Sequence, residues 1–375
     1  MNLLAGTRLA FLIGKTIPEP APASFVRAIE EIEVIQGDTA TGRDAFRITL
    51  SVGRSGVGAV EYDQLSTGLL DPLQRVAVIG QIGASPVGVL DGMILDHHFA
   101  PSTEPGRSKL ILTGEDISVL MDFEEKNKAY PNQPDGIIAM QIVGGYAKYG
   151  LVPPVSPSGP METVLQRVTT QTETDFAFLT RLAARNGHAF YAEPTPVPAV
   201  SLVSWGPERL GSPQSALTMN FLTGTTVHGL RFHLDAFSPR EETLPATGAL
   251  PGLGGFAGAQ STSPPLAAMP QAPVRRRMAR DATKMSTARA QARLAAGRSA
   301  SPDALVAEGE LDVARYGQPL RARRLVGLQG AGPAHSGLYY VRQVTHRIRP
   351  RMGQYLQSFT MVREGRGSTT AVVRR

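Results

Sequence analysis

The stretch ETDFAFLTRLAARNGHAFYAE, residues 173–193, predicts a helix followed directly by a strand. Thr174, or Thr172 two residues earlier, can accept hydrogen bonds from the free amides of a first helical turn, where Asp175 also suits the helix dipole. One helical face collects the apolar side chains Phe176, Phe178, Leu179, Leu182 and Ala183. Gly187 suits a left-handed helix stop, so His188 falls at the corner where the strand HAFYA begins.

Segments with the pattern of short β-strands lie on both sides of this unit. Five segments rich in Ile, Val and Leu precede it at barrel-like intervals: 27–36, 44–53, 73–82, 88–96 and 106–112. Residues 225–236 and 305–364 follow it with the same character. Alternation places Phe46, Ile48 and Leu50 on one face of their strand, and Tyr355, Gln357, Phe359 and Met361 on one face of the last strand.

The region between the two β sections mixes helices and strands. We expect a helix over 117–128, a second helix capped by Asp135 and ending at Gly150, and a strand over 163–169. Residues 237–304 lose the apolar pattern and are rich in Pro, Ala, Gly, Ser and Arg. This composition indicates a long insertion, with one helix expected over 284–297.

These patterns predict a mainly β chain with an α+β insert. The expected division is a first β-barrel domain at 1–115, an α/β inserted domain at 116–221, a second β-barrel domain formed by 222–238 with 305–365, a Pro/Ala/Arg-rich insertion at 239–304, and a flexible tail at 366–375.

Composition narrows the class of protein. The 375 residues are 42% hydrophobic and 19% charged, as in globular proteins, and the absence of Cys excludes disulfides, thiolate metal sites and a Cys nucleophile. No apolar run approaches the length of a membrane span, and the apolar N-terminus lacks the basic start of a signal peptide. We therefore expect a soluble protein without a membrane partner.

The net charge of +6 is concentrated in one segment. Residues 271–300 carry eight Lys or Arg and one Asp, a net +7, so the rest of the chain sums to −1. A nearly neutral body has no broad basic groove, and we expect no nucleic-acid partner. A nucleic-acid-binding protein that uses 271–300 remains an alternative, with salt-sensitive binding as its signature.

Motifs for catalysis are missing. GLGGFAG (252–258) has the wrong spacing for a dinucleotide loop, and no Walker loop, G-x-S-x-G or H-E-x-x-H occurs. Adjacent side chains on a strand point to opposite faces, so His97 and His98 beside Asp96 cannot easily hold one ion. The pairs Glu30–Glu31 and Glu124–Glu125 have the pattern of solvated faces.

We therefore predict no catalytic, cofactor-binding or metal-ligating residue and no cofactor, and we expect His188 to be a structural corner. A Ser-His-Asp set assembled from distant residues stays open at this point.

Four segments, in order, resemble the late control protein D family, which includes baseplate hubs of contractile phages and is similar to the N-terminal part of type VI secretion spike proteins. The opening stretch resembles the hallmark segment of the family. The others are KLILTGEDISVLMDFEEK (109–126), STARAQARLAAGRSA (286–300), and GELDVARYGQPLRARRLVGLQGAGPAHSGLYYVRQVTHRI (309–348) followed by QYLQSFTMVRE. Within the second segment, LTGEDISVLMDFEEK (112–126) looks closest to the sequences of hubs of extracellular contractile injection systems.

The resemblance implies two tube-like β-barrels with an α/β domain inserted between them. Three chains would form a ring whose six barrels mimic sixfold symmetry, joining a hexameric inner tube to a trimeric spike. The partners would be a homotrimer, the tube, the spike and baseplate proteins, in a particle or phage tail assembled in the bacterial cytoplasm. Because the sequence ends soon after the second barrel, we expect the spike to be a separate protein.

One alternative function and one open question about a segment accompany this non-enzymatic hub. A phage tail hub with cell-wall-degrading activity would show a cleft with two carboxylates at glycosidase separation, or a metal triad. The Arg-rich segment is either a solvated loop or a contact for acidic surfaces of neighbouring particle proteins.

Overall fold

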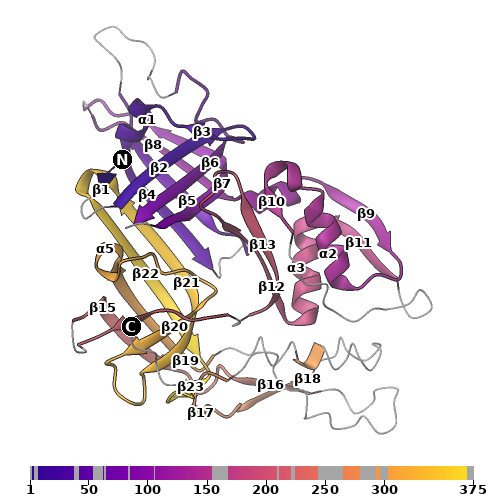
Figure 1. Ribbon diagram of the computed structural model, residues 1–375. Coiled ribbons are helices and arrows are strands. Elements are labelled where there is room, and N and C mark those ends of the chain that lie inside the picture. The colour runs from indigo at the N-terminus through magenta and orange to yellow at the C-terminus, as the bar shows by residue number, and fades with distance from the viewer. Residues whose placement is uncertain are drawn as a thin grey trace.

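The computed structural model describes the chain apart from residues 1, 4–6, 38–41, 54–61, 63–64, 83–84, 105, 154–167, 209–210, 221–223, 244–264, 279–292, 296–302 and 370–375. Two β sections lie next to each other, and a mixed insert projects from one side of them (Figure 1). The architecture is mainly β with an α+β insert, as the sequence predicts.

Strands of the N-terminal β section follow the predicted apolar segments. They are β1 (Asn2–Leu3), β2 (Thr7–Gly14), β3 (Glu19–Pro20), β4 (Ile29–Gly37), β5 (Ala45–Ser51), β6 (Arg75–Ile82), β7 (Ser85–Ala100) and β8 (Lys109–Asp116), with the short helix α1 (Ala23–Ala28) before β4. In β5, Phe46, Ile48 and Leu50 are buried and Arg47 is exposed. The predicted alternation is confirmed.

The insert packs helices against a small sheet. Its elements are η2 (Ile117–Asp122, a 3-10 helix), β9 (Glu125–Tyr130), α2 (Asp135–Gly144), η3 (Ala147–Tyr149, a 3-10 helix), β10 (Leu151–Val152), β11 (Thr169–Thr174), α3 (Asp175–Asn186), β12 (His188–Pro194) and β13 (Ser201–Pro207). β10, β13 and β12 form a three-stranded sheet, and β9 pairs with β11.

Helix α3 confirms the reading of the opening stretch. The Thr174 hydroxyl accepts a hydrogen bond from the Ala177 amide at 3.3 Å, and Gly187 ends the helix in the left-handed region at φ 67°. All five predicted apolar side chains are buried, and Thr180 and Arg181 on the opposite face are exposed. The sequence alone was sufficient to predict this helix, because its N-cap, its apolar stripe and its glycine stop all lie within one segment.

The helix predicted over 117–128 is wrong. The Asp116 carboxylate caps the Ser118 amide and starts a single 3-10 turn, η2, after which the chain becomes strand β9. β9 pairs antiparallel with β11 along its whole length, from Glu125 opposite Thr174 to Tyr130 opposite Thr169. Pairing with a strand about forty residues away overrides the local helical preference.

Two further details of the insert differ from expectation. Pro134 occupies the cap position of α2, whereas Asp135 is its first helical residue and binds the guanidinium of Arg185. The predicted continuation to Gly150 is interrupted, because α2 ends at Gly144 and η3 precedes the left-handed Gly150. The strand expected over 163–169 lies mostly outside the described residues, and the observed strand β11 begins at Thr169.

The C-terminal β section contains β14 (Gln214–Thr218), β15 (Val227–Leu234), β19 (Leu305–Asp312), β20 (Leu325–Gln329), β21 (Gly337–Arg349) and β22 (Gln354–Arg363), with α5 (Val313–Tyr316) and η5 (Pro350–Met352, a 3-10 helix). Tyr355, Gln357, Phe359 and Met361 are all buried on one face of β22, as predicted. β14 and β15 approach at Thr218 and Thr226, where the Thr226 amide donates to the Thr218 carbonyl at 2.8 Å.

One sheet joins the two β sections that were expected as separate barrels. β4 pairs antiparallel with β21, and the order of the main path is β1-β2-β6-β7-β8-β5-β4-β21-β22-β19-β15. Among the described strands this order is open, with β1 and β15 at its ends. The two sections also share one apolar core, whereas the insert has its own core around Phe178, Leu182 and Trp205.

Gly37 makes this junction between the sections possible. It ends β4 with φ 117°, and a Cβ there would lie 2.1 Å from the carbonyl oxygen of Arg342, which lies in the bulge of β21. Replacing Gly37 with alanine is expected to lower the free energy of unfolding by about 2 kcal/mol or more. Urea unfolding would measure the loss, with G53A as the control because nothing lies within 4 Å of its added Cβ. Equal stability of the two variants would contradict this account.

Polar contacts attach the insert to both β sections. Arg75 on β6 binds Asp91 on β7 at 2.7 Å, and the Ser201 hydroxyl of the insert donates to the same aspartate at 2.6 Å. On the other side, Arg321 of the C-terminal section binds Glu193 of the insert at 2.7 Å. The insert therefore has fixed polar contacts with each section.

Parts of the predicted insertion and tail pack against the C-terminal section. β17 (Met269–Pro270) pairs with β23 (Gly365–Arg366), and Leu266 beside it is buried. The Gly367 amide donates to the Ala334 carbonyl at 3.0 Å and the Thr369 amide to the Leu266 carbonyl at 3.3 Å, so residues 366–369 of the predicted tail contact the C-terminal section. Residues 370–375 lie outside the described residues. Of the helix expected over 284–297, residues 293–295 are described, and they are helical.

Candidate functional site: the polar face of the sheet

One face of the long sheet is polar across both β sections. Along β19, β22, β21, β4, β5 and β8, buried apolar residues alternate with exposed or half-buried residues that are mostly polar. A period of two places the second set on one face. We call this surface the polar face, and it includes Arg231, Glu308, Glu310, Ser358, Thr360, Gln343, Thr345, Arg347, Glu33, Arg47 and Thr113.

The polar face carries mixed charge in register. Glu33 on β4 lies opposite Arg347 on β21 and opposite Arg47 on β5, so three adjacent strands present a cation, an anion and a cation. The Arg347 guanidinium reaches the Glu33 carboxylate at 3.6 Å. Next to this row, Arg349 binds Glu31 at 3.1 Å. Opposite charges on facing strands stabilise the pairing and leave the surface nearly neutral.

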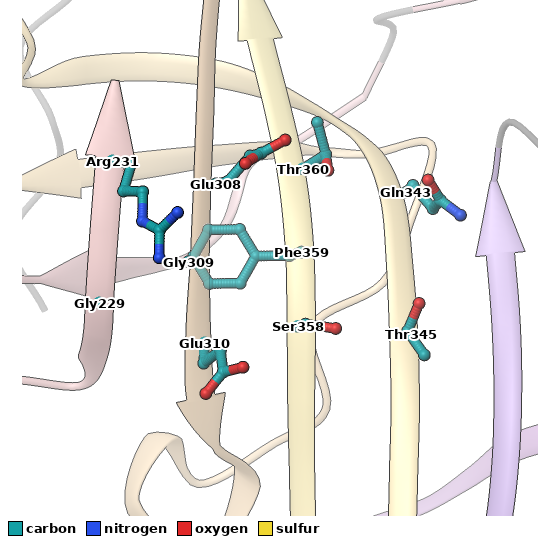
Figure 2. Close-up of a pocket in the computed structure, with 10 residues that line it drawn as sticks. All are labelled: Gly229, Arg231, Glu308, Gly309, Glu310, Gln343, Thr345, Ser358, Phe359 and Thr360. Atoms are coloured by element: carbon teal, nitrogen blue, oxygen red, sulfur yellow. The ribbon is translucent and has the colours of Figure 1, made fainter. Parts of the chain in front are cut away.

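A shallow groove of about 440 Å³ lies on this face at the β15 end (Figure 2). Figure 2 shows Glu308 and Glu310 on β19 on either side of Gly309, with Arg231 on the neighbouring strand. The register places Arg231 opposite Glu308, and Ser358 and Thr360 of β22 continue the polar floor. Gly309 is required on the core side, where a Cβ would lie 2.9 Å from the Phe359 ring.

Glu308 and Glu310 are the two carboxylates that this groove offers to the enzymatic alternative. They project from alternate positions of one strand on the open face of a sheet, and both are exposed. The surrounding side chains are hydroxyls, an amide and a guanidinium, and a tuned general acid needs a more enclosed environment. The two carboxylates therefore lie side by side on one exposed strand rather than facing each other across a cleft.

His188 lies at the helix-strand corner, as predicted. Its ring meets the Trp205 ring edge-on with centroids 4.4 Å apart, and burial lowers its pKa below the usual value. Within the described part of the chain, neither His188 Nδ1 nor Trp205 Nε1 has a hydrogen-bond partner. The contacts of His188 are those of a packed side chain.

The other residues singled out in the sequence are dispersed. His97 Nδ1 lies 3.3 Å from the Leu70 carbonyl oxygen, whereas His98 is exposed. Among the described residues, no group of three or more His, Asp or Glu side chains is placed to hold a metal ion. Likewise, no described helix has the length and apolarity needed to cross a membrane.

The two pairs of neighbouring glutamates differ in their surroundings. Glu30 binds Lys109, and Glu31 binds Arg349. Glu124 and Glu125 are exposed at the start of β9. Neither pair converges on a common point, so they act as surface ion-pair partners or solvated residues.

The glycine-rich residues 252–258 and most of 271–300 lie outside the described residues. Within the described residues of the Arg-rich segment, β18 (Arg275–Met278) pairs in parallel with β16 (Arg240–Thr243). All four residues of β18 are exposed, and Arg276 binds Glu241 at 3.1 Å. Contact of this segment with acidic neighbours stays a prediction.

Sequence reasoning missed a buried junction where the three regions meet. Arg323, in the left-handed region at φ 60°, donates to the Asp44 carboxylate at 2.7 Å and lies over the Tyr191 ring of the insert. The Asp44 amide donates to the Asp116 carboxylate at 2.7 Å. Burial raises the pKa of both aspartates, and for Asp116 the Asp44 charge adds to the effect. No local motif reveals this junction, because Arg323 lies 279 positions from Asp44.

The fold is shared with proteins of phage tails. A tail protein from Neisseria meningitidis MC58 superposes with a TM-score of 0.56 at 13% identity, covering 96% of this chain and 98% of that one. The 43 kDa tail protein of prophage MuSo2 from Shewanella oneidensis gives a TM-score of 0.58 at 14% identity, covering 95% and 99%.

A secretion component has the same fold. The E. coli c3393 protein gives a TM-score of 0.54 at 15% identity, covering 92% of this chain and 77% of that one. It is described as a component of the type VI secretion system with structural similarity to the T4 bacteriophage tail proteins gp27 and gp5. No protein-family model and no curated protein sequence matches the chain. The chain thus has a tail-protein fold at low sequence identity.

Proposed function

We propose that this chain is a structural baseplate hub, a homotrimer that joins a hexameric inner tube to a trimeric spike. The particle would be a contractile injection system or a phage tail, assembled in the bacterial cytoplasm with baseplate proteins as further partners. The observation that carries the proposal is the tail-protein fold, shared over at least 92% of this chain with two tail proteins and a type VI secretion component.

Two β sections in each chain offer a way to match a trimer to a hexamer. Three chains would place six barrel-like units around one axis, in the predicted domains 1–115 and 222–238 with 305–365. The main path of the sheet ends at β1 and β15, and β14 ends a branch through β20, so these strands are the described edges. Exposed edges invite pairing, and head-to-tail contacts between copies would cover them and close a ring.

Within this ring we assign the polar face to the wall of the central passage. The apolar side of the same sheet is occupied by the core, so the polar side is free to face solvent. Its alternating charges would keep the wall hydrated and without strong attraction for cargo of one sign. Glu308 and Glu310 are then wall residues, and the hub is not an enzyme.

The test is the native mass of the purified chain, alone and mixed with a candidate spike protein. Three copies of the 40.0 kDa chain give a species of about 120 kDa. A trimer alone, or one that forms on the spike, supports the hub, and end-on electron micrographs should then show six lobes. A monomer under both conditions contradicts the proposal, and peptidoglycan turnover compared between the wild type and E308Q/E310Q would become the next experiment.

A further inference from the structure

The insert contains a second groove, away from the polar face. It has a volume of about 430 Å³ and lies between β9, the end of α2 and η3. Lys126, Lys128 and Lys148 line it together with exposed Phe123 and the apolar side chains of Leu120 and Ile142. We propose that this groove binds an acidic protein segment that carries an apolar anchor residue.

One of the three lysines has a structural role. The Lys126 ammonium binds the buried Asp175 carboxylate at 2.5 Å, and that carboxylate also accepts from the Tyr146 hydroxyl at 2.8 Å and the Gln171 amide at 2.7 Å. This network joins β9, α3 and the end of α2. It fixes the floor of the groove, and Lys126 contributes little free positive charge.

The other two lysines are available to a partner. Lys128 and Lys148 are exposed, and neither forms an ion pair with a described residue. Each ammonium lies over a tyrosine ring at 4.9 Å, Lys128 over Tyr130 and Lys148 over Tyr149. These cation–π contacts hold both charges at the groove. Glu124 is the remaining acid of the lining, so the two lysines leave net positive charge.

Phe123 supplies the apolar part of the surface. It follows η2 directly, and 55% of its side chain is exposed. An exposed phenylalanine beside Leu120 and Ile142 gives an apolar anchor residue a place to bury its surface. The apolar patch and the two lysine charges of the groove are together complementary to an acidic segment that carries at least one large apolar residue.

Strand β9 adds a backbone contribution. Among the described strands it pairs with β11 alone, so its other edge keeps unpaired amide and carbonyl groups. An extended segment could pair with such an edge while its acidic side chains approach Lys128.

Of the aromatic residues that line the groove, Phe123 is the exposed one, and a single exposed ring favours a protein over a single-stranded nucleic acid, whose successive bases need several stacking faces. Base stacking requires free ring faces, but Tyr130 is 3% exposed and stacks on Phe178 at 5.6 Å. Tyr146 and Tyr149 each have one face covered by a lysine ammonium. The rings serve to place the lysines, which then attract carboxylates.

This inference is independent of the hub proposal, and peptide binding tests it with the full chain. The probe is a fluorescein-labelled eight-residue peptide of Asp and Glu with one Phe and one Leu, followed by anisotropy at low salt. We expect saturable binding that weakens at higher salt. K128E/K148E should weaken it by about tenfold or more, equivalent to ~1.4 kcal/mol. F123S should weaken it as well, whereas K15E, which reverses an exposed lysine elsewhere, should leave it unchanged.

Controls separate the groove from general charge attraction. A peptide with Gln and Asn in place of the acids, and one with Ser in place of Phe and Leu, should each bind more weakly. Circular dichroism melting confirms that the variants fold. Equal binding by K128E/K148E and K15E, no binding of the acidic peptide, or preferential binding of a single-stranded oligodeoxynucleotide at Lys128 and Lys148 would overturn the proposal.

Discussion

Replacing Arg75 with methionine is expected to lower the free energy of unfolding by about 3–5 kcal/mol, because it leaves a buried aspartate without its cation. Arg75 is 1% exposed, and its Nε and Nη2 donate to the two carboxylate oxygens of Asp91, each at 2.7 Å. Its Nη1 donates to the carbonyl oxygens of Thr16 and Tyr149 at 3.0 and 2.9 Å. One side chain thus links the N-terminal β section to the insert.

Urea unfolding of the full chain would measure this loss. R47M is the matched control, because Arg47 is an exposed arginine of the polar face and its replacement should cost about 0.5 kcal/mol or less. The double variant R75M/D91L removes both buried charges and should be at least as stable as R75M alone. A loss below about 1 kcal/mol in R75M would show that Asp91 gains another partner or water.

The second large effect is a pH dependence of stability at the buried junction. Burial, with the neighbouring Asp44 carboxylate, raises the pKa of Asp116 to about 7, whereas an unfolded aspartate titrates near 4. Between those values the folded chain holds a proton that the unfolded chain has lost. The contribution of Asp116 to stability is therefore full below about pH 4 and is lost as the pH rises through about 7.

Comparison with D116N isolates this contribution. On acidification from pH 8 to pH 4, the wild type should gain stability relative to D116N by up to about 1.4 kcal/mol per pH unit within the window. The asparagine also disturbs the hydrogen bonds to the Asp44 and Ser118 amides, but that cost is a constant offset and does not change the slope. Urea midpoints at four pH values would give the slope, and D96N at an exposed site is the control. Parallel curves for wild type and D116N would refute the assignment.

The buried His346 is the reason why the pH dependence of stability must be measured as a difference between the wild type and D116N. Burial lowers the pKa of His346 to about 3, and its ring is held by Tyr355 and Gln36 at 2.7 and 3.0 Å. This neutral ring stabilises the fold above about pH 6.5, and its contribution is lost as the pH falls toward 3. The slope from His346 opposes that from Asp116, so the wild-type curve alone would hide both.

The elements that the sequence predicted well are those specified locally. Cap, apolar stripe and glycine stop all belong to α3, and the period-two pattern of β5 and β22 lies within single strands. The helix predicted over 117–128 failed for the opposite reason, because the strand β9 that begins there depends on pairing with β11. Candidate site residues followed the same rule. His97 and His98 could be assigned to opposite faces from alternation, whereas the polar face needed the register of six strands.

The sequence by itself determined the mainly β class, the position of the helix-strand unit, the charge concentrated at 271–300, and the absence of local catalytic motifs. Only the tertiary structure decided that β4 joins β21, that Arg75 and Arg323 attach the insert, and that charges align across the polar face. The physical reason is range: caps and stripes act between residues a few positions apart. Sheet register and buried ion pairs can join residues as far apart as Asp44 and Arg323, which are 279 positions apart, once the core has brought their strands together.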